Sequence, residues 1–125
     1  MATILLSVKP KYIEKIFNGT KKYEFRKKLA KLDVSKIILY STSPCKLVVG
    51  EVEVTGTLSK KPAQMWQDTK KYAGITKKGF DDYYKNSLCA YAYKLGDTLK
   101  YQTPKNLSEL GIERAPQSFI YFSYD

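Results

Sequence analysis

The sequence predicts an α+β fold, a small mixed β-barrel of about six strands with two or three flanking helices. Short apolar or alternating segments recur along the chain, separated by Gly, Pro and Ser turn signals and by stretches with helical spacing. The chain has 125 residues, of which 43% are hydrophobic, and it carries no internal repeat or low-complexity run. Because this is the usual size of one domain, we expect a single domain over residues 1–125.

A strand and a helix open the chain. Residues 3–8 form an apolar, β-branched run, which predicts a buried strand. Pro10 suits the first turn of a helix, and Gly19 suits the left-handed residue that closes it. The residues that recur with helical spacing between them, and give the helix one apolar face, are Tyr12, Ile13, Ile16 and Phe17.

Residues 19–27 concentrate the chemistry of the chain. A strand follows the helix at once, and its two aromatic residues, Tyr23 and Phe25, are expected to face the core. The charged residues on its other face are Lys22, Glu24 and Arg26. Glu24 is then a single acceptor in a site rich in donors, which suits a phosphate or a base edge. The alternative is an edge strand that its charges protect from aggregation.

Two further strands are expected before the middle of the chain. Residues 37–42 form a second buried strand, which ends at the turn signal of residues 43–44. Residues 47–58 alternate clearly between apolar and polar side chains. Gly50 and Gly56 within this segment allow the bends or bulges that close a small barrel.

Two helices follow. Pro62 starts the first, and Thr76 is a suitable N-cap for the second. The residues expected on their buried faces are Met65, Trp66 and Thr69 in the first and Phe80, Tyr83 and Tyr84 in the second.

The remaining third of the chain is expected to be mostly β. Residues 89–95 alternate as a strand, and Gly96-Asp97 predicts a hairpin turn into a further strand at residues 99–101. A loop with one helical turn at residues 107–110 comes next. A second turn signal at residues 115–118 then precedes a closing strand at residues 119–124.

The charge of the chain favours a polyanionic partner. It contains 22 Lys and Arg against 12 Asp and Glu, a formal net charge of +10, and its pI is about 9.5. Eleven Tyr and five Phe accompany these cations, and bases stack on aromatic rings beside basic groups. We therefore expect RNA or a nucleotide as partner, the alternative being a lysine-rich surface that only keeps the protein in solution.

The composition also excludes several kinds of site. The chain has no histidine, which removes every Ser-His or Cys-His nucleophile arrangement. Cys45 and Cys89 are single and far apart, so we expect free thiols in a reducing cytoplasm, with a disulfide as the alternative. We expect no metal and no cofactor. No signal peptide precedes Thr3, and no apolar run approaches the ~20 residues that span a membrane, so a cytoplasmic protein is predicted.

The spacing Gly19-x-Lys21-x-x-Glu24-x-Arg26 resembles the GxKxxExR signature of the ASCH domains, a branch of the PUA-like superfamily, at all four positions. Three further segments resemble small bacterial and archaeal proteins described as PUA-like predicted transcriptional regulators. They are Ile4-Leu5-Leu6-Ser7-Val8-Lys9-Pro10, Tyr40-Ser41-Thr42-Ser43-Pro44 and Ala115-Pro116-Gln117-Ser118-Phe119. Together these segments cover the chain from end to end.

This resemblance implies a PUA-like β-barrel with a cleft beside the first helix, and recognition of RNA or a modified nucleotide. In such a cleft the basic residues would hold phosphate, Glu24 would accept a hydrogen bond from a base or ribose, and polar turns would line the walls. The residues assigned to it are Lys9, Lys21, Glu24, Arg26, Lys27, Ser41, Thr42, Ser43, Gln117 and Ser118.

Some ASCH relatives are enzymes, which gives a second hypothesis. One group hydrolyses the acyl amide of N4-acetylcytidine with a Lys, a Thr and a Glu, and others are ribonucleases. Lys21 matches the lysine, the threonine position is Glu24 here, and the region of the glutamate reads Lys70-Lys71-Tyr72-Ala73. If the chain is a hydrolase, Lys21 is the expected nucleophile or acid/base and Glu24 its partner. A third hypothesis is a module whose basic face binds an acidic protein.

Overall fold

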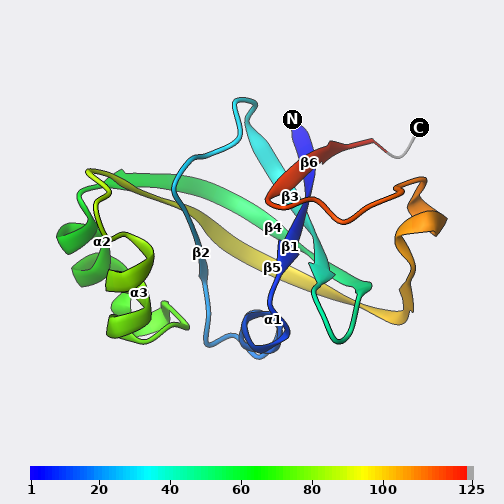
Figure 1. Ribbon diagram of the computed structural model, residues 1–125, viewed down its shortest axis with the longest axis horizontal. Coiled ribbons are helices and arrows are strands. Elements are labelled where there is room, and N and C mark those ends of the chain that lie inside the picture. The colour runs from blue at the N-terminus through cyan, green and yellow to red at the C-terminus, as the bar shows by residue number, and fades with distance from the viewer. Residues whose placement is uncertain (124–125) are drawn as a thin grey trace.

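A computed structural model describes residues 1–123 and contains a six-stranded mixed sheet, three α-helices and two short 3-10 helices (Figure 1). In chain order the elements are β1 (Ala2–Val8), α1 (Pro10–Phe17), β2 (Tyr23–Arg26), β3 (Val34–Ser41), β4 (Leu47–Lys60), α2 (Pro62–Thr69), η1 (Lys70–Tyr72), α3 (Lys77–Tyr83), β5 (Ala90–Lys105), η2 (Leu107–Leu110) and β6 (Phe119–Phe122). The predicted α+β class is confirmed.

The strands lie in the order β2-β5-β4-β3-β1-β6. Strands β1 and β3 pair in parallel, and every other neighbouring pair is antiparallel. Strands β2 and β6 form the two edges of this sheet. The guanidinium of Arg26, at the end of β2, donates to the hydroxyl of Ser118, just before β6. The sheet therefore curls until side chains of its two edges meet, as in the predicted small barrel.

Three apolar clusters fill the molecule. Helix α1 covers one face of the sheet, where Ile13 and Ile16 pack with Ile4 and Leu6 of β1. Leu5, between those two residues of β1, belongs to a second cluster on the opposite face, under the η2 segment. The buried strand predicted for residues 3–8 is thus apolar on both sides because both of its faces are covered.

A third cluster joins α2 and α3 to β2 and β5, on the left in Figure 1. Phe80 of α3 lies at its centre, with its ring centroid 5.1 Å from that of Phe25 and 5.2 Å from that of Trp66. The hydroxyl of Thr76 accepts from the backbone N–H of Gly79 at 3.0 Å, so the predicted N-cap is confirmed. Within residues 1–123 every helix is too short, or too polar, to cross a membrane.

The predicted hairpin at Gly96-Asp97 is wrong. Both residues lie inside β5, which runs for 16 residues without a turn and pairs with β4. A Cβ on Gly96 would lie 2.8 Å from Cγ2 of Thr55 on β4. Gly96 therefore permits a close approach of two strands. In the sequence, a glycine in this role cannot be distinguished from a glycine in a turn.

The bends predicted at Gly50 and Gly56 coincide with register shifts. The pairing of β4 with β5 shifts between Val48 and Gly50 and again between Val54 and Gly56. The closing strand predicted for residues 119–124 is confirmed over Phe119–Phe122, while Tyr124 lies outside the described residues.

Candidate functional site

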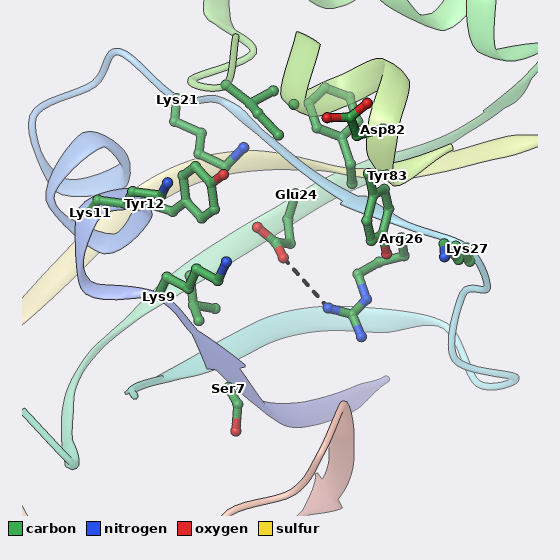
Figure 2. Close-up of a pocket in the computed structure, with 14 residues that line it drawn as sticks. Ser7, Lys9, Lys11, Tyr12, Lys21, Glu24, Arg26, Lys27, Asp82 and Tyr83 are labelled. Carbon is green, nitrogen blue, oxygen red and sulfur yellow. Dashed lines mark ion pairs between the residues drawn. The ribbon is translucent and has the colours of Figure 1, made fainter. Parts of the chain in front are cut away.

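A cleft of about 690 Å³ opens between α1, β2 and α3, beside the end of β1 (Figure 2). Its lining combines basic, acidic and aromatic side chains from these four elements and the segments next to them. The residues are Ser7, Val8, Lys9, Lys11, Tyr12, Lys21, Glu24, Phe25, Arg26, Lys27, Ile75, Gly79, Asp82 and Tyr83. It thus includes Lys9, Lys21, Glu24, Arg26 and Lys27, all of which the sequence assigned to the cleft beside the first helix.

The turn between α1 and β2 brings Lys21 to the cleft. Gly19 ends the helix with a φ of 84°, and the backbone N–H groups of Thr20 and Lys21 both donate to the carbonyl oxygen of Lys15 at 3.0 Å. This wraps the turn tightly onto the helix and directs the chain into β2. Pairing of Glu24 with Tyr93 on β5 then fixes the register of the four-residue strand.

Lys21 is buried, with only 3% of its surface exposed. Its ammonium group donates to the carbonyl oxygen of Ala73 at 2.7 Å and lies 4.9 Å and 5.1 Å from the ring centroids of Phe25 and Tyr12. Gly74 packs against the aliphatic part of the same side chain. Segment 73–74 therefore determines where the ammonium group lies, through a contact 52 residues away in sequence.

Glu24 is the buried acidic group of the cleft, 9% exposed. Its Oε2 lies 3.6 Å from Nη1 of Arg26, the ion pair drawn in Figure 2. Burial raises the pKa of Glu24 above its ordinary value, against the opposing effects of Lys21 and Arg26. Arg26 is held in turn by the Tyr84 hydroxyl, which donates to its carbonyl oxygen at 2.9 Å.

Burial also lowers the pKa of Lys21, while Glu24 opposes this shift and Lys15 adds a smaller lowering. Desolvation is the main cause of the shift in the Lys21 pKa. Burial disfavours the charged form of both groups, while each group favours the charged form of the other. Such a pair is suited to acid/base work, and perturbed groups of this kind cluster at functional sites.

The rim of the cleft carries exposed cations and half-buried tyrosine rings. Lys9 and Lys27 are exposed, and the ammonium group of Lys27 lies 5.0 Å from the ring centroid of Tyr83. Tyr12 and Tyr83 lie on opposite sides of Glu24 in Figure 2. The sequence placed both rings on apolar helix faces, so their helical spacing concealed a position on the cleft wall.

The other assigned residues lie farther away. Ser41 is buried in β3, whereas Thr42 and Ser43 belong to the following turn, and none of the three lines the cleft. Ser118 is connected to the site through its hydrogen bond with Arg26, but Gln117 is exposed and does not line it.

Sequence reasoning missed two features of the site. One is Ser7, whose hydroxyl donates to the carbonyl oxygen of Pro116 at 2.7 Å, and the other is the segment Ala73-Gly74. A backbone carbonyl has no residue-type signal, so no motif could have identified Ala73.

Comparisons with known proteins show the fold and the family of this chain. The family model for the ASCH domain matches residues 6–99. A crystal structure of ASCH from Zymomonas mobilis superposes with a TM-score of 0.89 at 24% identity, covering 98% of this chain and 88% of that one. The same fold therefore holds in that protein.

Two curated proteins align over nearly the whole chain. The large ribosomal subunit protein uL22 of Ureaplasma parvum serovar 3 is 32% identical over 120 residues, which are 95% of this chain and 39% of that protein. The ASCH domain-containing ribonuclease of Zymomonas mobilis is 27% identical over 122 residues, 94% of this chain and 82% of that protein. The chain thus spans about two fifths of the first relative and most of the second. With the family model matching three quarters of its length, including the segment from Gly19 to Arg26, the chain belongs to the ASCH domain family.

Proposed function

We propose that this domain binds single-stranded RNA, with one nucleotide of the strand inside the cleft. The observation that carries the proposal is the composition of that cleft: exposed ammonium groups and tyrosine rings surround one buried carboxyl group. Nucleic-acid sites that accept single strands combine the same two elements, cations for the backbone and aromatic rings for the bases.

Each group then has a distinct role. Lys9 and Lys27 on the rim take the phosphates, because their side chains are exposed. A base stacks on Tyr12 or Tyr83. Glu24 accepts a hydrogen bond when ionised and donates one when protonated, so it can bond either kind of base edge.

RNA binding that weakens with salt tests this assignment. The affinity for a single-stranded oligonucleotide should fall with a log-log slope of roughly −0.7 for each phosphate held. Replacing Lys9 and Lys27 together by alanine should make that slope shallower by about 1.4. Lys61→Ala/Lys85→Ala, two exposed lysines outside the cleft, is the matched control and should keep the slope. An affinity that does not change between low and physiological salt would contradict the proposal.

Ribonuclease activity is a second candidate, supported by the 27% identity to a ribonuclease and by the buried Lys21 and Glu24. In this reaction ionised Glu24 removes the proton of a ribose 2′-hydroxyl, whose oxygen attacks the adjacent phosphorus. Protonated Lys21 gives a proton to the departing 5′-oxygen, leaving a 2′,3′-cyclic phosphate and a 5′-hydroxyl. Release of the proton from Glu24 to water and uptake of a proton from water by Lys21 restore both groups.

Cleavage is tested by incubating the protein with bulk RNA and identifying the ends of the products. Lys21→Ala should abolish formation of the cyclic phosphate product, whereas the variant should still bind RNA through the rim lysines. Cleavage that survives Lys21→Ala would exclude this assignment. Acylated nucleosides in the same assay test the amidohydrolase-like alternative. That reaction would need a glutamate from residues 70–73, but this segment has no carboxylate and contacts Lys21 through the carbonyl oxygen of Ala73.

A transcriptional role, a cytoplasmic location and binding of an acidic protein through the basic face rest on the sequence alone. The RNA proposal is preferred to an acidic protein partner because the cleft adds aromatic rings to its cations.

A further inference from the structure

A second basic and aromatic surface adjoins the cleft. It consists of Tyr72 with Lys15, Lys22 and Lys71, and is called the Tyr72 surface below. The backbone N–H of Lys22, at the entry to β2, donates to the carbonyl oxygen of Tyr72 at 2.9 Å. Tyr72 is followed by Ala73, whose carbonyl oxygen holds the ammonium group of Lys21. The Tyr72 surface therefore lies next to the segment that holds Lys21 in the cleft.

Two ammonium groups lie against the Tyr72 ring, and a third lies beside Gly74, two residues further along the chain. Those of Lys22 and Lys71 are 4.4 Å and 5.5 Å from the ring centroid of Tyr72, and that of Lys15 lies 3.4 Å from the carbonyl oxygen of Gly74. All three lysines are exposed, while Tyr72 is half-buried. Part of its ring is thus accessible beside cations.

These lysines are not neutralised by the fold. In the described part of the chain the ion pairs use Arg26 and Lys36, Lys60, Lys77 and Lys78, and none of them includes a lysine of the Tyr72 surface. Asp97 lines a cavity of about 340 Å³ together with Lys22 but forms no ion pair with it. A cluster of like charges lowers the stability of the folded state. An anionic partner removes that cost.

We propose that an RNA strand bound in the cleft continues across the Tyr72 surface, with a second base on the Tyr72 ring and the backbone on its lysines. The inference rests on the proposed RNA binding of the cleft and extends it from one nucleotide to several. RNA fits better than an acidic protein because the tyrosine ring offers a stacking partner for a base, which a carboxylate chain does not use.

Binding of oligouridylates of two and eight nucleotides tests the proposal. The dinucleotide occupies the cleft alone, whereas the octanucleotide reaches both surfaces. Tyr72→Ala should weaken octanucleotide binding about 5- to 100-fold, the usual effect of losing one base stack, and change dinucleotide binding less than about 2-fold. Lys22→Ala/Lys71→Ala should make the salt slope of the octanucleotide alone shallower by about 1.4.

The double lysine variant keeps the test valid if Tyr72→Ala fails to fold, because both lysines are exposed. Lys61→Ala/Lys85→Ala is again the control and should leave both oligonucleotides unaffected. Equal losses for the two lengths, or no loss for either, would overturn the inference while the cleft proposal stands. Absence of wild-type binding at both lengths would refute the proposed function itself. Polyglutamate that binds the wild type as tightly as the octanucleotide, and loses affinity in the same variants, would assign the surface to an acidic protein instead.

Discussion

Gly74 packs directly on the buried side chain of Lys21. A Cβ on Gly74 would lie 2.5 Å from the Cβ and 2.6 Å from the Cγ of Lys21, and Gly74 has a φ of 65°, which favours glycine. One residue thus provides both the turn into α3 and the space that Lys21 fills. The position of the proposed acid/base group consequently depends on a glycine outside the GxKxxExR motif.

Gly74→Ala should destabilise the protein by about 1–3 kcal/mol more than Gly111→Ala does, because only the first change forces a side chain to move. Gly111 is the matched control, since it has a φ of 74° and nothing within 4 Å of an added Cβ. Urea denaturation of the two variants measures the difference. Equal destabilisation would mean that backbone conformation alone requires glycine at position 74.

Glu24→Gln should change the pH dependence of stability. The raised pKa of Glu24 in the folded state means that its stabilising contribution is complete at low pH and is lost as the pH rises through the folded pKa. The pKa of Lys21 is lowered, so its stabilising contribution is instead lost as the pH falls through its folded pKa. Removal of the Glu24 charge lowers that pKa further, which adds to the loss of stability of Glu24→Gln at low pH relative to wild type. The free energy of unfolding of Glu24→Gln relative to wild type should therefore increase with pH.

Denaturation by urea at a series of pH values from about 4 to 8 measures this trend. Glu113→Gln, at an exposed position, serves as the control for the loss of one carboxyl group from the chain. A relative stability of Glu24→Gln that decreases with pH would mean that Glu24 is charged and well paired in the folded protein.

Tyr84→Phe should lower the free energy of unfolding by about 1–2 kcal/mol, because two backbone carbonyl groups lose the hydroxyl that bonds them. The Tyr84 hydroxyl lies 2.9 Å and 3.0 Å from the carbonyl oxygens of Arg26 and Tyr91, which face each other across the β2–β5 pair. Tyr72→Phe, at a half-buried ring, is the comparison variant and should cost less. Thermal denaturation of both variants measures the two losses of stability. Equal losses would mean that the Tyr84 hydroxyl does not stabilise the fold.

Tyr83→Leu should reduce RNA affinity about 5- to 100-fold if a base stacks on this ring, whereas Tyr83→Phe should keep affinity within about 2-fold. The reason is that stacking needs the ring and not the hydroxyl. Fluorescence anisotropy of a labelled oligonucleotide measures both variants. Similar losses in the two variants would indicate that the hydroxyl, rather than the ring face, contacts the RNA.

Local spacing predicted most of the elements, and its one clear failure is instructive. The apolar run of residues 3–8, the helical spacing after Pro10 and the cap at Thr76 all describe contacts with near neighbours in sequence, and each element is present. The hairpin prediction at Gly96-Asp97 failed because the lack of a side chain at Gly96 makes room for Thr55 on another strand and does not serve a turn. A glycine required by a distant side chain looks the same in sequence as a glycine required by a turn.

The sequence by itself determined the α+β class, the basic and aromatic character of the surface, and the motif that joins Gly19, Lys21, Glu24 and Arg26. Only the tertiary structure decided that Lys21 and Glu24 are buried, that Ala73 and Gly74 hold the lysine, and that the turn at residues 42–43 lies outside the cleft. The physical reason is that periodicity reports which side of an element a residue occupies. Burial, and the pKa shifts that follow from it, depend on what other segments place over that side.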